Sequence, residues 1–310
     1  MTRAFVFPGQ GAQAVGMGRD LADAFPSARA VFEEVDAALG ERLSDLIWHG
    51  DIATLTLTEN AQPALMAMSL AAMRALEAEG IGVDHAAFVA GHSLGEYSAL
   101  CAAGALGVAD TARLLRARGK AMQAAVPVGE GAMAAILGLD LAGVEAVVSA
   151  SAKGECLAAA NDNDPAQVVI SGTKDAVARA IEHAKAAGAK RAVPLPVSAP
   201  FHCALMQPAA DAMAEALVDV EIRTPKVPIV VNVRAEAVDQ PDLVRRLLVE
   251  QVTGAVRWRE SVQWMLDKGV TEFWEVGAGK ALSGMIRRIA KDAATRPVGK
   301  VEDVMAAAAG

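Results

Sequence analysis

One stretch of the sequence combines a serine with the two glycines that a nucleophile elbow requires. It reads Gly91-His92-Ser93-Leu94-Gly95 and lies between an apolar run, 86–90, and a helix-forming segment, 96–103. A strand and a helix can pack closely across so sharp a turn only if no Cβ projects there, and the serine oxygen at the apex is then exposed. The pattern predicts Ser93 as a nucleophile. The alternative is a structural turn, because a chain with 27 glycines can contain Gly-x-Ser-x-Gly by chance.

A serine hydroxyl is a weak nucleophile unless a neighbouring base accepts its proton, and the chain has five histidines. His92 precedes the serine in the elbow, so its side chain should diverge from the serine oxygen. Three others fall in predicted loops or on a predicted exposed helix face: His49, His85 and His183. His202 follows Ser93 in the chain, as the histidine does in α/β-hydrolase-like sheets. Elimination favours His202 as the base, and a helix-capping histidine is the alternative.

A third member of a triad is not marked in the sequence. The acidic residues between Ser93 and His202 fall in segments that we assign to a small subdomain or to the surface. A backbone or amide carbonyl could orient the imidazole instead, which would give a dyad. Cys203 is adjacent to the histidine but lies on no elbow, so we interpret it as a small core residue.

The composition predicts a soluble, cytoplasmic, globular protein. The chain has 310 residues, of which 53% are hydrophobic, and no apolar run is long enough to span a membrane. Its first apolar run is broken by Pro8 and Gly9, too early for a signal peptide. The net charge of -8 argues against a general nucleic-acid or anionic-membrane surface. Three widely spaced cysteines indicate neither a disulfide framework nor a zinc site.

Apolar strands alternate with helices along the chain, which predicts an α/β fold with a mainly parallel sheet covered on both faces. The order strand-helix-strand-strand-helix-strand over 128–197 is that of a ferredoxin-like unit. We therefore predict a small subdomain at 128–197 inserted into a larger body formed by 1–127 and 198–310. We also expect Asp110 to cap a helix over 111–125, and the alanine-rich end, 304–310, to fray.

Several motifs occur together and in the order found in a known family. The chain closely resembles the malonyl-CoA:acyl carrier protein transacylases of type II fatty acid synthesis, and more loosely the acyltransferase domains of polyketide synthases. The matching segments cover nearly the whole chain, including the inserted unit: 7–11 (Phe-Pro-Gly-Gln-Gly), 58–63 (Thr-Glu-Asn-Ala-Gln-Pro), 91–97, 118–123 (Arg-Gly-Lys-Ala-Met-Gln), 163–172, 198–206 and 275–281.

The resemblance implies an α/β-hydrolase-like large subdomain, a ferredoxin-like small one and a two-step acyl transfer. His202 would deprotonate Ser93, which would attack the malonyl thioester to form an oxyester. The phosphopantetheine thiol of the carrier protein would then take the malonyl group. The backbone N–H groups of Gln10 and Leu94 would stabilise the oxyanion in both steps. No metal or cofactor is expected beyond these two substrates.

Arg118 is the residue that we expect to select the acyl group. A malonyl group ends in a carboxylate, which a guanidinium can hold with two parallel hydrogen bonds, whereas a lysine offers only a point charge. The alternative is a solvated basic residue on a helix face. The match of 118–123 to the family motif favours the first interpretation, and the same motif implies that Met122 also binds substrate.

The resemblance implies three further site residues. Phe201 stands where related domains carry phenylalanine for malonyl and serine for methylmalonyl groups, which suggests that its ring narrows the acyl pocket. Gln251 matches the residue whose backbone carbonyl orients the histidine. Asn163 matches an asparagine near the substrate, with turn formation as an equal alternative.

Coenzyme A and the carrier protein are anionic, so an acidic enzyme must meet them through local basic patches. Candidate residues lie at the edge of the small subdomain and near the C-terminal helix: Lys190, Arg191, Lys280, Arg287, Arg288 and Lys291. The alternative for each is a solvated helix face. We expect a monomer.

Three other functions share parts of this pattern. A serine esterase or thioesterase would have the same elbow and histidine, but water would resolve its acyl-enzyme. A discrete trans-acting polyketide synthase acyltransferase would share the chemistry and use another carrier. A non-catalytic binding module would need a degenerate site, which the intact Ser93, His202 and Arg118 disfavour.

Overall fold

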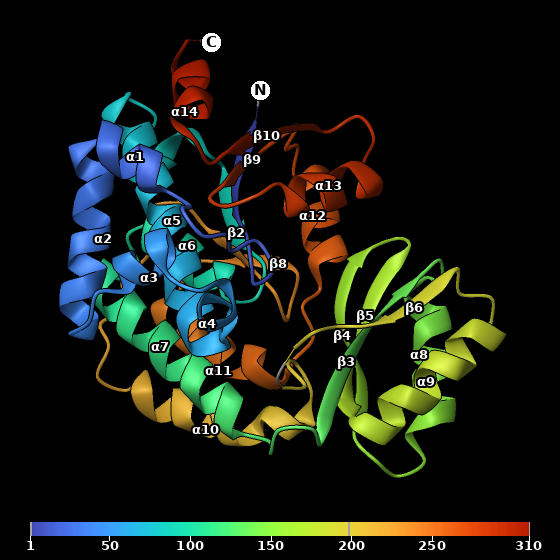
Figure 1. The fold of residues 1–310 in the computed structure, drawn as a ribbon. Helices are drawn as coiled ribbons and strands as arrows, with labels where there is room; N and C mark the ends of the chain where they lie inside the picture. The colour runs from blue at the N-terminus through green and yellow to red at the C-terminus, as the bar shows by residue number, and fades with distance from the viewer. Residues whose placement is uncertain (1, 198, 310) are drawn as a thin grey trace.

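The computed structural model describes residues 2–197 and 199–309 (Figure 1). The predicted subdomain limits at 1, 198 and 310 lie outside the described residues. Two sheets organise the chain, and we call the parts built on them the large and the small subdomain.

The large subdomain contains a six-stranded sheet with the strand order β10-β9-β1-β2-β7-β8. The strands are β1 (Arg3–Phe7), β2 (Phe88–Gly91), β7 (Ile229–Val231), β8 (Glu236–Val238), β9 (Glu272–Val276) and β10 (Ala294–Val298). Neighbouring strands are parallel except β7 and β8. The predicted mainly parallel sheet is confirmed. Strands β8 and β10 were not predicted, because neither has an apolar run.

Helices cover both faces of this sheet, as the alternation along β1 requires. Phe5 and Phe7 pack into the larger core cluster, whereas Ala4 and Val6 pack into a second cluster on the opposite face. The second cluster is closed by α12 (Trp258–Asp267) and α13 (Ala281–Ile289). The larger cluster includes α1 (Arg19–Ala24), α2 (Pro26–Leu39), α3 (Leu43–His49), α4 (Ile52–Thr56), α5 (Thr58–Ala78), α6 (Gly95–Ala102), α7 (Val108–Ala124), α10 (Gln207–Ala216), α11 (Pro241–Thr253) and α14 (Val301–Ala308). Short 3-10 turns occur at Val83–His85 and Ala204–Met206.

Two predictions of local structure are wrong. Helix α7 begins at Val108, so Asp110 lies in its first turn, where it accepts a hydrogen bond from Arg113 at 2.7 Å instead of capping the helix. In the segment expected to fray, 304–310, residues 304–308 belong to α14, because Asp303 accepts hydrogen bonds from the backbone N–H groups of Gly299 and Lys300, both at 3.0 Å. Residue 310 lies outside the described residues. Burial of Val304 holds this helix against the body of the protein.

The small subdomain is a four-stranded antiparallel sheet with the order β4-β5-β3-β6. Its elements are β3 (Gly131–Leu137), α8 (Leu141–Ala152), β4 (Leu157–Asp164), β5 (Gln167–Thr173), α9 (Lys174–Ala186) and β6 (Arg191–Pro194), all within the predicted range 128–197. Ile136 and Ile170 pack with the two helices on one face, whereas Met133 and Val169 belong to the core cluster of the large subdomain. This arrangement confirms the predicted ferredoxin-like fold.

The end of β4 joins the two subdomains beside α12 and α13 (Figure 1). Val256 donates a backbone hydrogen bond to Ala160 at 2.8 Å and accepts one from Asp162 at 2.9 Å. Two ion pairs support this junction, Arg259 with Asp162 at 2.8 Å and Arg288 with Asp164 at 2.7 Å. The small sheet is thereby fixed over the carboxyl ends of the parallel strands. None of the described helices is long and apolar enough to cross a membrane.

Candidate active site

The predicted elbow connects β2 to α6. Its apex residue, Ser93, has a φ of 53°, in the left-handed region of backbone conformation that residues other than glycine rarely adopt. A Cβ on Gly91 would lie 1.9 Å from the carbonyl carbon of Gly95, and a Cβ on Gly95 would lie 2.2 Å from the carbonyl oxygen of Phe7. Both positions therefore require glycine. Asn232 braces the turn, since its Oδ1 accepts the Ser93 N–H at 2.8 Å and its Nδ2 donates to the Gly91 carbonyl at 2.6 Å.

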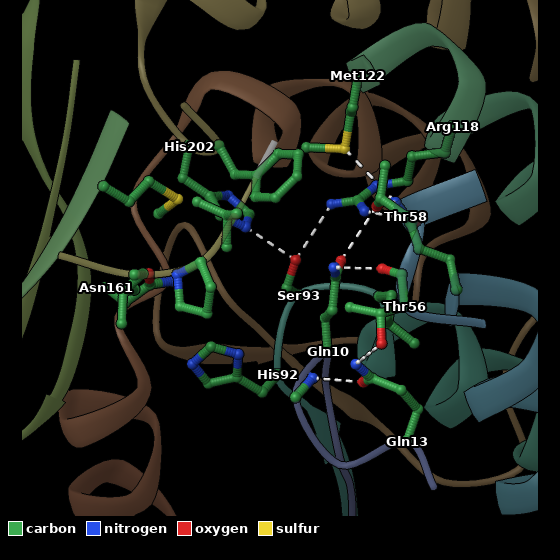
Figure 2. A pocket seen from close by; sticks show the side chains of 18 residues that line it. Gln10, Gln13, Thr56, Thr58, His92, Ser93, Arg118, Met122, Asn161 and His202 are labelled. Atoms are coloured by element: carbon green, nitrogen blue, oxygen red, sulfur yellow. Dashed lines mark hydrogen bonds between the residues drawn. The ribbon is translucent and has the colours of Figure 1, made fainter. Parts of the chain in front are cut away.

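His202 lies against the serine. Its Nε2 is 2.8 Å from Ser93 Oγ (Figure 2). Its Nδ1 is 3.0 Å from the backbone carbonyl oxygens of both Gln251 and Gly254. Carbonyl oxygens only accept hydrogen bonds, so Nδ1 carries the proton and Nε2 is free to receive the serine proton. The two carbonyls occupy the place that an acid takes in a Ser-His-Asp triad.

The imidazole is neutral over the physiological pH range. Burial lowers the pKa of His202 to about 3, and the nearby Arg118 guanidinium and His92 act in the same direction. A neutral imidazole is the form that can act as a general base.

Arg118 extends from α7 to the other side of the serine (Figure 2). Its side chain is 1% exposed, which excludes the alternative of a solvated helix face. Nη1 donates to Gln62 at 2.7 Å, while Nη2 donates to the Gln251 side chain at 2.9 Å and to Ser93 Oγ at 3.2 Å. Nε forms no hydrogen bond in the described part of the chain. Burial lowers the pKa of Arg118, but a guanidinium remains a cation in proteins.

These groups share a cavity of about 290 Å³ that lies between the two subdomains. Polar groups gather on one side, and apolar side chains of the small subdomain and its return segment close the other. The lining includes Gln10, Thr58, Gln62, His92, Ser93, Leu94, Arg118, Met122, Met133, Asn161, Leu195, Val197, Phe201 and His202. Across residues 2–197 and 199–309, no group of three or more His, Cys, Asp or Glu side chains is arranged to hold a metal ion.

Gln10 and Leu94, the expected oxyanion donors, both line this cavity. Gln10 lies in the loop after β1, where its side chain accepts a hydrogen bond from Thr58 Oγ1 at 3.0 Å. Leu94 is the residue before α6. The N–H groups at a helix N-terminus have no acceptor within the helix, so that of Leu94 can be donated to a ligand.

Asn163 does not belong to the described lining of the cavity, in contrast to the sequence-based expectation. Its Oδ1 is 2.8 Å from His92 Nε2, and the His92 ring packs on Trp258 with a centroid distance of 5.9 Å. The amide is thus used to hold His92, which diverges from the serine as expected. Asn161, two residues earlier on β4, reaches the cavity instead.

The cysteine next to the histidine is a core residue. Cys203 is 1% exposed, and its Sγ donates to the Pro200 carbonyl at 3.2 Å. Burial raises the pKa of the Cys203 thiol to about 12, so it does not form a thiolate near neutral pH.

The candidate docking residues lie at two separate places. Lys190 and Arg191 are exposed at β6, one edge of the small sheet, whereas Arg288 pairs with Asp164 at the end of β4, the opposite edge. Three strand spacings separate these edges, roughly 14 Å. Arg287 is exposed and donates to Thr295 at 2.8 Å. The basic residues therefore form two patches, and in one of them a carboxylate already pairs with Arg288.

Sequence reasoning missed three polar residues that the structure places at the site. Gln62, Glu96 and Asn232 are each 1% exposed and contact Arg118, Gln251 or the elbow. One signal was available for Asn232, which directly follows a buried parallel strand at the sheet edge where sites form. Gln62 and Glu96 are polar residues within apolar helical segments.

A strained serine at a strand-to-helix turn, paired with a histidine on an α/β sheet, defines a protein that forms an acyl-serine intermediate. The model of the acyl transferase domain family matches residues 4–305, and the chain belongs to this family. The resemblance found in the sequence is thereby confirmed.

Relatives with specific names extend this comparison. The malonyl CoA-acyl carrier protein transacylase of Bacillus subtilis (strain 168) is 46% identical over 302 residues, which are 97% of this chain and 94% of that protein. The crystal structure of an acyl-carrier-protein S-malonyltransferase from Bartonella henselae is 55% identical, with a TM-score of 0.97 and coverage of 99% and 98% of the two chains. A malonyl-transacylase in complex with its type II polyketide synthase acyl-carrier protein is 42% identical, with a TM-score of 0.97 and coverage of 100% and 99%.

Proposed function

We propose that the protein is an acyl-carrier-protein S-malonyltransferase, which moves a malonyl group from malonyl-CoA to the phosphopantetheine thiol of acyl carrier protein and so supplies fatty acid synthesis. The observation that carries this proposal is the buried guanidinium of Arg118, whose Nη2 lies 3.2 Å from the nucleophilic oxygen of Ser93. Relatives at 46% and 55% identity carry the corresponding names.

The first half-reaction transfers the acyl group to the enzyme. His202 Nε2 accepts the proton of Ser93 Oγ as the oxygen bonds to the thioester carbon. The tetrahedral intermediate carries an oxyanion, which the N–H groups of Leu94 and Gln10 stabilise. The carbon–sulfur bond then breaks, and His202 returns the proton to the coenzyme A sulfur.

The second half-reaction follows the same path in reverse with another thiol. His202 accepts the proton of the phosphopantetheine thiol and the sulfur attacks the oxyester carbon. The bond between this carbon and Ser93 Oγ then breaks, and His202 returns the proton to Oγ. The intermediate uses the same oxyanion donors. The proposed chemistry requires no metal or cofactor, because proton transfer and hydrogen bonding stabilise each step.

Arg118 supplies the preference for malonyl. Its N–H groups can hold a carboxylate through two parallel hydrogen bonds, and Nε has no partner among the described residues. A hydrolase of neutral esters would have no use for a buried cation beside its nucleophile. Phe201 and Met122 form apolar walls of the same cavity, which limits the size of the group carried at the α-carbon.

The carrier protein is proposed to dock across the mouth of the cleft as a partner of a monomeric, cytoplasmic enzyme. Exposed Lys190 and Arg191 on one side and Arg287 on the other would meet its acidic surface. Arg288 contributes less charge, because Asp164 pairs with it.

A transfer assay tests the proposed function. The enzyme is mixed with malonyl-CoA, and coenzyme A release is followed with and without carrier protein bearing phosphopantetheine. We expect one equivalent of rapid release without carrier, followed by sustained turnover when carrier is added. Sustained release without carrier would instead identify a thioesterase.

A discrete acyltransferase that serves a polyketide synthase is the second candidate. The observation that favours it is the 42% identity to the malonyl-transacylase of the type II polyketide synthase complex. The same assay with carrier proteins of both pathways distinguishes the two candidates by the ratio of kcat/KM values.

A further inference from the structure

Glu96 is a buried carboxyl group that none of these steps uses. It lies in the first turn of α6 and is 1% exposed. Its Oε2 accepts hydrogen bonds from the backbone N–H of Asn232 at 2.8 Å and from Gln251 Nε2 at 3.1 Å. Burying a carboxyl group is costly unless partners compensate it, so its position beside the site requires an explanation.

The side chain of Gln251 and the backbone N–H of Asn232 connect Glu96 to the groups at the site. Gln251 Nε2 donates to Glu96 and also to the Ser93 carbonyl at 3.0 Å, which leaves Gln251 Oε1 to accept from Arg118 Nη2 at 2.9 Å. An amide has one donor end and one acceptor end. Glu96, as the acceptor, therefore turns the oxygen of Gln251 towards Arg118. Asn232 provides a second connection: its backbone N–H donates to Glu96, and its side-chain Oδ1 accepts the Ser93 N–H.

The charged and titratable groups that face Glu96 are Arg118 from α7 and Tyr97, its neighbour on α6. Gln251 from α11 and Asn232 after β7 are neutral. Burial raises the pKa of Glu96 to about 7, against the opposing influence of its two hydrogen bonds and of Arg118. Glu96 can therefore change its charge near neutral pH, within the electrostatic reach of the guanidinium.

We propose that Glu96 is a positioning residue for acyl-group selection: it orients Arg118 through Gln251, and its negative charge competes with the malonyl carboxylate for that guanidinium. The inference rests on the proposed function. In the empty site, the Glu96 carboxylate compensates Arg118. When a malonyl carboxylate arrives, two anions share one cation, and protonation of Glu96 relieves their repulsion.

Malonyl transfer should be faster at lower pH. The malonyl carboxylate remains ionised well below neutral pH, so only Glu96 titrates near pH 7. Malonyl transfer is favoured at a pH where Glu96 is protonated and becomes slower as the pH rises. An acetyl group has no carboxylate that the ionised Glu96 could repel, so its transfer should not show this dependence. The ratio of kcat/KM for malonyl-CoA to kcat/KM for acetyl-CoA removes effects of His202 that both substrates share.

The first test compares this ratio in the wild type, in Glu96→Gln and in the exposed control Glu33→Gln between about pH 6 and about pH 8.5. We expect the ratio to fall about tenfold with rising pH in the wild type and the control, which corresponds to one unit of coupling between two carboxylates. In Glu96→Gln, the amide oxygen can still accept both hydrogen bonds, but the ratio should be independent of pH. Equal slopes in all three proteins would overturn the proposal.

The second test needs no variant and therefore holds even if Glu96→Gln does not fold. Acyl transfer from coenzyme A to Ser93 converts a hydroxyl and a thioester into an ester and a thiol, with no net proton release near pH 7. In a weakly buffered solution with a pH indicator, loading with malonyl-CoA should consume protons, and loading with acetyl-CoA should not. Equal proton balances for the two substrates would contradict the inference.

These tests separate the inference from the function on which it rests. A wild type that does not prefer malonyl-CoA to acetyl-CoA would refute the proposed function. A wild type that prefers malonyl-CoA with the same pH dependence as Glu96→Gln would leave that function intact and refute only the role of Glu96.

Discussion

At the scale of single residues, the site places two charged or chargeable partners on opposite sides of one oxygen. Ser93 Oγ lies 2.8 Å from His202 Nε2 and 3.2 Å from Arg118 Nη2. In the proposed function, the imidazole removes the serine proton and the guanidinium receives the acyl carboxylate. Each role predicts a separate change when one side chain is altered.

Removing the guanidinium should change which acyl group is transferred. In Arg118→Ala, the malonyl carboxylate loses two charge-assisted hydrogen bonds, so the malonyl-to-acetyl ratio of kcat/KM should fall about 100-fold or more. Competition assays with both thioesters measure this ratio. Arg113→Ala is the matched control, because Arg113 lies on the same helix and its side chain is exposed. An unchanged ratio in Arg118→Ala would remove the assignment.

His202 should remain a neutral, effective base at acid pH. Burial lowers the pKa of His202 to about 3 from its usual 6.5, so the neutral form persists as pH falls through 6.5. The rate of Ser93 acylation by acetyl-CoA should therefore stay nearly constant from about pH 8 to about pH 5, where an ordinary histidine would lose about 30-fold. Rapid-quench acylation at each pH measures this profile.

Arg118→Ala provides an internal check on that profile. Loss of the neighbouring cation should raise the pKa of His202, because the guanidinium is one cause of its depression. The acid limb of acetyl transfer should then move to higher pH. A fall in the rate of acetyl transfer centred near pH 6.5 in the wild type would contradict the claim that burial keeps His202 neutral.

At the scale of elements, the elbow depends on the close approach of β1, β2 and α6. A Cβ at Gly95 would lie 2.2 Å from the Phe7 carbonyl oxygen and 2.9 Å from that of Pro8, so α6 would have to move away from β1. Strand and helix then no longer hold Ser93 at the apex.

Gly95→Ala should therefore lower the free energy of unfolding by about 3 kcal/mol or more and abolish acylation. Thermal and urea unfolding measure the first effect. Gly284→Ala is the control, because a Cβ there meets only the end of the Arg288 side chain at 3.6 Å and alanine is the better helix former. Equal stability of the two variants would show that a Cβ at position 95 does not disturb the packing of α6 against β1.

The sequence predicted β2 and α6 on either side of the elbow, because the apolar run 86–90 and the helix-forming segment 96–103 are visible in composition. It did not predict α3 and α4, which are too short to show a helical period, or β10, whose Arg296 and Pro297 suit an edge strand. Asp110 looked like a cap because the first helical residue was placed three positions late.

Within the site too, some residues could be predicted from the sequence and others could not. Ser93, His202 and Arg118 belong to motifs with a direct chemical purpose. Glu96 contacts the Gln251 side chain and Asn232 contacts the elbow backbone, and only the fold brings these partners together. Asn163 matched a motif, but its amide contacts His92 rather than the cavity.

At the scale of the whole molecule, the cleft exists because the small sheet is held over the large one. Backbone hydrogen bonds at Val256 and the pairs Arg259–Asp162 and Arg288–Asp164 join them. The segment from Gln251 to Val256 also supplies both carbonyls that hold His202, so the junction and the base share one support.

Docking of the carrier protein should depend on exposed charge beside this cleft. Arg287→Glu should raise the KM for carrier protein several-fold more than the KM for malonyl-CoA, because only the carrier presents an extended acidic surface. Initial rates at varied concentrations of each substrate provide both constants. Arg223→Glu is the control, since Arg223 is exposed and belongs to the segment after α10. Equal changes for both substrates would exclude a docking role for Arg287.

The central claim is that Ser93 carries the malonyl group between the two substrates. Incubation with labelled malonyl-CoA, followed by proteolysis and mass spectrometry, locates the label directly. We predict label on the peptide containing Ser93, no label in Ser93→Ala, and loss of the label to the thiol of carrier protein when it is added. Label on another residue, or label that leaves as free malonate at the same rate with and without carrier protein, would contradict the account.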